Sequence, residues 1–142
     1  MNWFTNNLEL YLRLAGLAQL ILVLGSFFIP KQLGWNKELS SANQLVRQLF
    51  WTYGGYILGS HLFFGLVSAF AAPALLESGP LGLALLSFMG LWWSIRIILQ
   101  FTCFDRTCIP PNRFNVIAES ILVLMFFCLS ITYLGALWVH HF

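Results

Sequence analysis

Charged residues are scarce in this sequence of 142 residues, where Asp, Glu, Lys and Arg together make up 8% of the chain. A soluble domain carries about 25% charged residues, so this chain lacks the polar surface that a protein needs in water. The net charge of +2 is too small, and the basic residues too scattered, to favour a nucleic-acid partner. Hydrophobic residues instead make up 59% of the chain, which indicates a membrane protein.

The sequence also lacks the short motifs of common enzyme classes. It contains no HExxH zinc motif, no nucleophile elbow, no phosphate-binding loop and no redox CxxC pair. The three cysteines form no even disulfide framework. These absences leave the question of catalysis open and argue against an enzyme more than for one. The N-terminus has no basic region before its first apolar run, so we expect that run to be a retained helix.

Four apolar stretches are each long enough to cross a bilayer, whose core of about 30 Å needs about 20 helical residues. They cover residues 8–29, 49–72, 81–101 and 115–139. Prolines stand at the boundaries, where a residue without a backbone donor does not interrupt a helix: Pro30, Pro73, Pro80, Pro110 and Pro111. The sequence therefore predicts an all-α fold, a single domain over residues 1–142 that forms a bundle of four transmembrane helices.

The basic residues between these helices predict the orientation of the bundle. They fall in the first and third connecting segments: Lys31, Lys37, Arg47, Arg106 and Arg113. The second connection, residues 73–80, has none. Because cytoplasmic loops carry excess Lys and Arg, we expect both termini on the outer side. Arg13 is an exception near the outer face, with Glu9 one turn earlier to offset it.

The longest polar segment, residues 35–45, allows two interpretations. Its leucines favour a short amphipathic helix on the cytoplasmic membrane surface. The alternative is an ordinary solvated loop.

Arg96 and Glu119 are ionisable residues inside the third and fourth apolar stretches. At 1.5 Å per residue, both lie roughly 6 to 9 Å inside the cytoplasmic boundary, which predicts an ion pair. Gln100, one turn from Arg96, is expected to hydrogen-bond to the same carboxylate. The pair either locks two helices together or serves a ligand or a proton, with Glu119 as acid or base and Arg96 holding an anionic head group.

His61 lies near the middle of the second stretch, at a depth similar to that of Gln19 in the first. A hydrogen bond between these two side chains is one interpretation, and a proton relay or haem ligand is the other. A haem site needs a second histidine at matching depth, whereas His140 and His141 lie at the end of the chain, which argues against haem. Cys103 and Cys108 lack further soft ligands nearby, so we predict no metal site.

Polar and aromatic residues recur at helical spacing along the predicted helices. Facing inward, they would line an interior suited to a flat apolar ligand such as a quinone or a lipid, although such stripes also serve packing. Gly55 and Gly59 form a GxxxG pattern that permits close helix approach. The candidate ligand-binding residues are Gln19, His61, Trp92, Arg96, Gln100, Glu119 and Tyr133.

In size and layout the chain resembles the small four-span bacterial membrane proteins, DoxX-like proteins among them. This likeness is architectural, and no residue role is carried over from it. We expect a multi-pass protein of the bacterial inner membrane, either an accessory subunit of a membrane complex or a binder of an apolar lipid or quinone-type ligand. Its expected partners are membrane lipids and either further copies of itself or other membrane subunits. The alternative is an intramembrane enzyme or small transporter that uses Arg96, Glu119 and His61.

Overall fold

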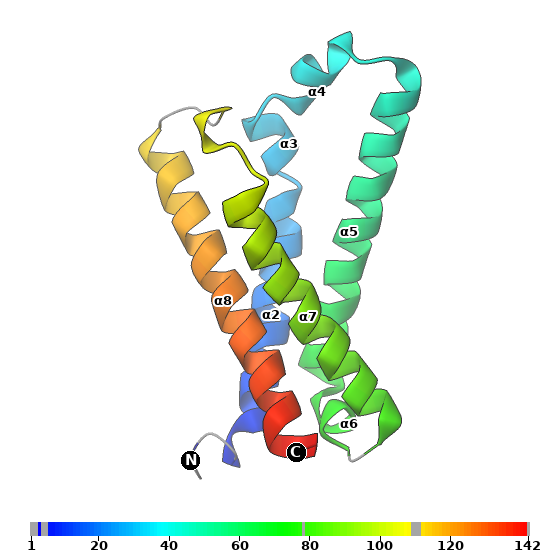
Figure 1. Cartoon of the computed structure of the whole chain (residues 1–142), viewed down its shortest axis with the longest axis vertical. Coiled ribbons are helices and arrows are strands. Elements are labelled where there is room, and N and C mark those ends of the chain that lie inside the picture. The colour runs from blue at the N-terminus through cyan, green and yellow to red at the C-terminus, as the bar shows by residue number, and fades with distance from the viewer. Residues whose placement is uncertain (1–2, 4–5, 78, 109–111, 142) are drawn as a thin grey trace.

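The computed structural model describes residues 3, 6–77, 79–108 and 112–141, and in these ranges the protein consists of helices joined by short turns (Figure 1). The long helices are α2 (Leu8–Ser26), α5 (Gln44–Phe70), α7 (Pro80–Thr102) and α8 (Arg113–His141). Shorter elements connect them: α3 (Ile29–Gln32), α4 (Trp35–Glu38), η1 (Leu39–Ser41), α6 (Ala72–Leu76) and η2 (Arg106–Cys108). The predicted all-α class is confirmed.

Local sequence explains where these helices begin and end. Asn43 has an extended backbone, and its side-chain oxygen accepts a hydrogen bond from the Val46 amide at 2.9 Å, which caps α5. Pro80 opens α7, where its missing amide proton is not needed. Gly34 has φ of +64°, a left-handed conformation that separates α3 from α4. The polar segment after Gly34 is helical over α4 and η1.

Three of the long helices, α2, α7 and α8, are long and apolar enough to cross a membrane. The helix α5 is long enough, but it is not among them. Its middle third contains tyrosine, glycine, serine and histidine, which lower its average apolarity: Tyr53, Gly54, Gly55, Tyr56, Gly59, Ser60 and His61. The sequence predicted four membrane-spanning helices, and three of the long helices are long and apolar enough to be such spans.

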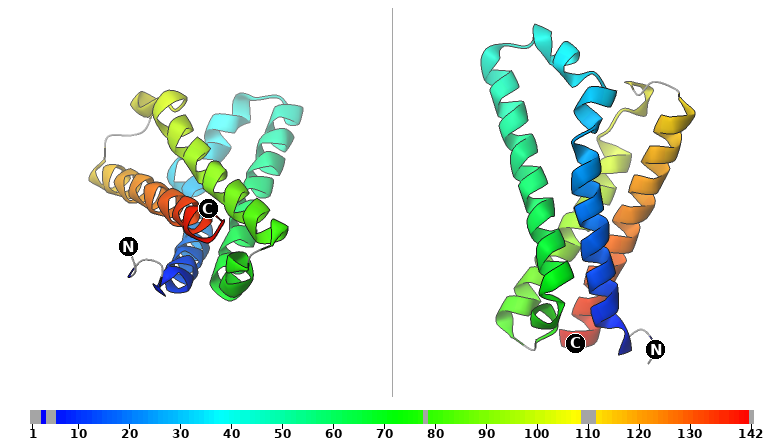
Figure 2. Two further views of the ribbon diagram at one scale, coloured as in Figure 1. Left: turned by 60° about the horizontal axis from the view of Figure 1, so that its bottom comes forward. Right: turned by 180° about the vertical axis from the view of Figure 1, so that it is seen from behind.

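The helices pack as two pairs, α2 against α5 and α7 against α8, with further contacts between α2 and α8. The short α6 packs against α7. Towards α4, the first part of α5 diverges from the other long helices (Figures 1 and 2). Residues 43–57 are accordingly all exposed, whereas the buried residues of α5 all lie between His61 and Ala69.

Small residues allow the closest of these helix contacts. A Cβ atom placed on Gly16 would lie 2.4 Å from the Ala69 backbone nitrogen and 2.8 Å from the Gly65 carbonyl oxygen. Between α7 and α8, a Cβ atom on Gly90 would lie 2.6 Å from Cδ2 of the Leu134 side chain. These contacts fix α2 against the second half of α5 and α7 against α8.

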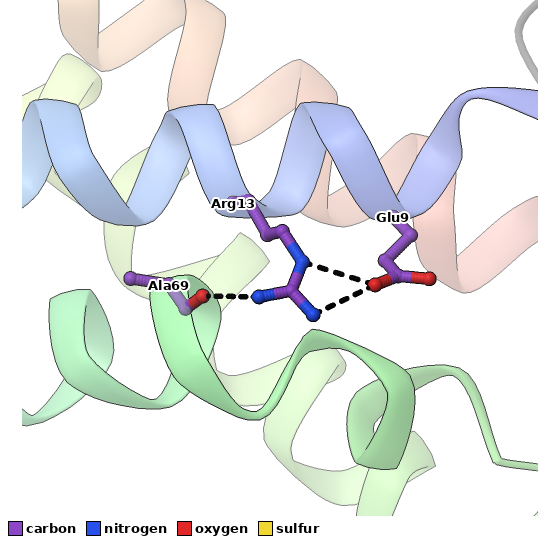
Figure 3. Close-up of polar contacts among 3 residues, drawn as sticks. All are labelled: Glu9, Arg13 and Ala69. Carbon is purple, nitrogen blue, oxygen red and sulfur yellow. Dashed lines mark hydrogen bonds and ion pairs between the residues drawn. The ribbon is translucent and has the colours of Figure 1, made fainter.

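Arg13 joins α2 to the end of α5 (Figure 3). Its Nη2 lies 2.8 Å from Glu9 Oε1, and its Nη1 donates a hydrogen bond of 3.0 Å to the Ala69 carbonyl. Because α5 ends at Phe70, that carbonyl belongs to the last turn, which has no intrahelical donor. The cation therefore satisfies an acceptor at the negative end of the helix dipole. This contact explains a basic residue at an end of the molecule that otherwise has few.

Candidate functional site

An aromatic column at the centre of the molecule takes one ring from each of three helices. The His61 imidazole of α5 stacks on Trp93 of α7, with ring centroids 4.8 Å apart and an interplanar angle of 28°. On its other side Trp93 stacks on Phe126 of α8 at 5.4 Å and 26°. Trp93 is fully buried in this arrangement. We refer to these three residues as the aromatic column.

His61 also contacts a second tryptophan, Trp92, which lies outside the column. Trp92 Nε1 donates a hydrogen bond of 3.2 Å to His61 Nε2 and also packs edge-on against Phe64. This bond uses the Nε2 atom of the imidazole as an acceptor. The interpretation that His61 hydrogen-bonds to Gln19 is therefore wrong, because His61 binds Trp92 and Gln19 binds Tyr133.

Arg96 lies at the other end of the column. Its guanidinium carbon is 5.3 Å from the Phe126 ring centroid and 4.9 Å from that of Phe104, which is the geometry of cation–π contacts. The predicted ion pair between Arg96 and Glu119 is wrong, because Arg96 contacts aromatic rings and Glu119 accepts a hydrogen bond from Gln100. Phe126 follows Glu119 by seven residues, or about 10 Å of helix, so α8 meets Arg96 roughly two turns beyond the expected level.

The partner of Glu119 is Gln100, which the sequence had also predicted. Gln100 Nε2 donates a hydrogen bond of 3.2 Å to Glu119 Oε1, as the sequence predicted. The two residues link α7 to α8 near the turn between these helices. In that turn, Asp105 Oδ1 accepts hydrogen bonds from the Thr107 hydroxyl and amide, and these bonds lower the pKa of Asp105. Asp105 thus serves the conformation of its own turn.

A buried polar network joins α2, α5 and α8. Gln19 donates a hydrogen bond through Nε2 to the Tyr133 hydroxyl, which lies 2.7 Å from the Ser68 hydroxyl. All three side chains are fully buried. Nearby, the hydroxyls of Ser94 and Ser130 lie 2.7 Å apart and link α7 to α8. Hydrogen bonds between helices of this kind stabilise a specific packing in hydrocarbon. The buried Gln19 Oε1 has no hydrogen-bond partner within the described chain.

We expect Tyr133→Phe to lower the free energy of unfolding by about 1 to 2 kcal/mol, because Ser68 and Gln19 both lose a buried partner. The measurement is reversible unfolding in mixed micelles followed by circular dichroism. Tyr53→Phe removes the same hydroxyl from an exposed position and should change stability by less than about 0.5 kcal/mol. Equal stabilities for the two variants would contradict the assignment of this network.

A groove of about 450 Å³ runs between the outward face of α5 and α7. It is lined by Gly55, Tyr56, Gly59, Ser60, Phe63, Phe64, Leu85 and Phe88. A Cβ atom on either glycine would have no neighbour within 4 Å, so the GxxxG pattern makes no close contact within the chain. We call this feature the α5 groove. The groove is open on the side of α5, and α7 borders it through Leu85 and Phe88.

The predicted site residues thus fall into three separate groups. Gln19 and Tyr133 share the buried network, His61 and Trp92 belong with the column, and Gln100 pairs with Glu119. The sequence missed the central position of Trp93, because Trp92 and Trp93 fitted the inner face of α7 equally well. No group of three His, Cys, Asp or Glu side chains among the described residues is placed to hold a metal ion.

Arg96 joins none of these groups through a hydrogen bond within the described chain, and its contacts are with aromatic rings. The arrangement is therefore one of stacking and interhelical hydrogen bonding. No family model, no curated protein and no solved structure matches this chain.

Proposed function

We propose that this is a multi-pass protein of the bacterial inner membrane in which α5 forms a fourth crossing beside α2, α7 and α8. Its 27 residues span about 40 Å, more than the core of a bilayer. The start of α2 and the end of α8 lie at the same end of the molecule, as four crossings require (Figure 1). The basic residues around α3, α4 and η2 favour a cytoplasmic location for the opposite end.

Within this arrangement we assign the protein the role of a non-catalytic subunit of a membrane assembly, with a transmembrane helix of a partner seated in the α5 groove. One observation carries this proposal. The one long helix that is not among the candidate membrane spans, α5, also has an uninterrupted exposed stretch at residues 43–57, which includes Tyr53, Gly54, Gly55 and Tyr56. A helix rich in glycine, serine and tyrosine is poorly suited to lipid and well suited to another helix, because small residues permit close backbone approach.

Gly59→Leu is the test, because Gly59 lines the α5 groove and a Cβ atom there would have no neighbour within 4 Å. For wild type we expect native mass spectrometry after gentle extraction to detect a stoichiometric assembly, either of several copies or with another membrane subunit. Gly59→Leu should reduce the assembled fraction about tenfold relative to the free chain. The matched control is Gly54→Leu, an equally open glycine of α5 outside the groove. A monomeric wild-type chain, or equal effects of both variants, would overturn the proposal.

A second candidate occupant is an apolar ligand of the lipid or quinone type. The aromatic wall of the groove favours such a ligand, since the rings of Phe64 and Phe88 pack edge to face with centroids 5.8 Å apart and Tyr56 also lines the groove. Such a ligand would appear in the same mass spectrum as a retained small mass at fixed stoichiometry. Phe88→Ala should then release it while leaving a helix-mediated assembly largely intact.

The geometry gives less support to an intramembrane enzyme or transporter built on Arg96, Glu119 and His61. That function needs the three groups around one substrate. Glu119 is instead bonded to Gln100, while the imidazole is enclosed by Trp92 and Trp93. A single acid–base centre is therefore the weaker proposal.

A further inference from the structure

A second cavity, of about 660 Å³, lies where α4 and η1 meet the first turns of α5. It is lined by Asn36, Leu39, Gln44, Arg47, Gln48, Trp51 and Thr52. It is open to the surface, and its lining side chains are exposed except for that of Leu39, which is half-buried. We call it the Arg47 pocket. It shares no lining residue with the α5 groove.

The polar side chains of this pocket are uncommitted. Within the described chain, the side chains of Asn36, Gln44, Arg47 and Gln48 form no hydrogen bond or ion pair with one another or with other groups. Thr52 also differs from Thr102 and Thr132, whose hydroxyls donate to a carbonyl of their own helix. No acidic side chain lines the pocket, so the charge of Arg47 is not neutralised there. Such a lining presents hydrogen-bond donors and one cation to a ligand.

An aromatic cluster holds the wall of the pocket in place. The Trp35 ring of α4 packs edge-on against the Phe50 ring of α5, with centroids 5.1 Å apart. The centroid of the Trp51 ring lies 6.3 Å from that of Trp35. Indole rings concentrate at the boundary between membrane and water, where one edge is wet and the other apolar. After Trp51, α5 stays exposed as far as Ile57, and its buried residues begin at His61. The pocket therefore lies where a lipid head group would meet the protein.

We propose that the Arg47 pocket binds the phosphate-bearing head group of an anionic phospholipid. The Arg47 guanidinium would pair with the phosphate, because its planar fork matches phosphate oxygens. The amides of Asn36, Gln44 and Gln48 would bond to the glycerol and ester oxygens, and the acyl chains would lie along the surface of α5 below Trp51. This inference rests on the proposed crossing of α5 and is independent of what occupies the α5 groove.

The test is native mass spectrometry of the full-length protein in detergent with dioleoyl phosphatidylglycerol or dioleoyl phosphatidylcholine, which have identical chains. We expect one phosphatidylglycerol to be retained in preference to phosphatidylcholine. Arg47→Gln should weaken its apparent affinity about fivefold, as loss of one interfacial cation predicts. The matched control is Lys31→Gln, which removes an exposed cation of α3 outside the pocket and should change affinity less than twofold. Gln48→Leu gives a second measure of how the pocket contributes to the affinity for phosphatidylglycerol, since it removes a hydrogen-bond donor of the pocket and keeps the net charge.

Three results would overturn the inference: equal retention of the two lipids, equal effects of Arg47→Gln and Lys31→Gln, or glycerol 1-phosphate binding as tightly as phosphatidylglycerol. The last result would identify a site for a soluble phosphate ester. Circular dichroism of each variant identifies a loss of folding. The same spectra report the assembly state, so failure of this site and failure of the α5 groove are separate outcomes.

Discussion

Gly16→Leu is expected to lower the free energy of unfolding by about 3 kcal/mol, at the upper end of the range for overpacked cores. The reason is the nature of the neighbours. Even the first atom of a side chain at this position would lie 2.4 Å from the Ala69 nitrogen and 2.8 Å from the Gly65 oxygen. Backbone atoms in a helix cannot move aside as a side chain can, so α2 must separate from α5.

That separation would also affect the Arg13 contact with the Ala69 carbonyl and the Gln19 contact with Tyr133, because both join α2 to other helices. Reversible unfolding in mixed micelles, followed by circular dichroism, measures the loss. Gly25→Leu is the matched control, because it places the same side chain on the same helix where no atom lies within 4 Å. It should be neutral or slightly stabilising, since leucine favours helix over glycine. Similar stabilities of the two variants would contradict the close crossing of α2 and α5.

Much of the secondary structure could be predicted from the sequence, because proline and apolar length determine where long helices form. Pro80 opens α7, and α2 ends shortly before Pro30. Apolarity was less informative for α5. A count of apolar residues predicts that this helix spans a membrane. Its mean hydropathy is nevertheless too low to place it among the candidate spans, because it mixes glycine and tyrosine with leucine. The difference reflects a face that the chain itself leaves uncovered.

The contacts between side chains were harder to predict, because they depend on how two helices cross. Counting residues from the helix ends placed Arg96 level with Glu119, whereas the packing of α7 on α8 brings it to Phe126. The same reasoning paired His61 with Gln19 by depth, although depth does not determine which face of each helix meets which neighbour. Only the pair closest to the turn, Gln100 and Glu119, was predicted correctly, since there the connection limits the relative shift of the helices.

Trp93→Ala is expected to lower the free energy of unfolding by about 3 kcal/mol, the lower end of the range for a buried tryptophan. Trp93 is fully buried between the rings of His61 and Phe126, so its removal leaves a cavity where three helices meet. Two terms keep the loss from being larger. The hydrophobic transfer term is weak for a protein that unfolds within hydrocarbon, and the buried Trp93 Nε1 has no hydrogen-bond partner within the described chain to lose.

The matched control for this variant is Trp138→Ala, since Trp138 lies on α8 with 72% of its surface exposed. It should cost less than about 1 kcal/mol. Trp93→Phe separates stacking from volume, because phenylalanine restores most of the ring contact and should recover more than half of the lost stability. If Trp93→Ala were no more destabilising than Trp138→Ala, the aromatic column would not be the element that joins α5 to α7 and α8. The second half of α5 would then be held to the bundle by its other contacts, which are the close approach of Gly16, the Arg13 bond to the Ala69 carbonyl and the bond between Ser68 and Tyr133.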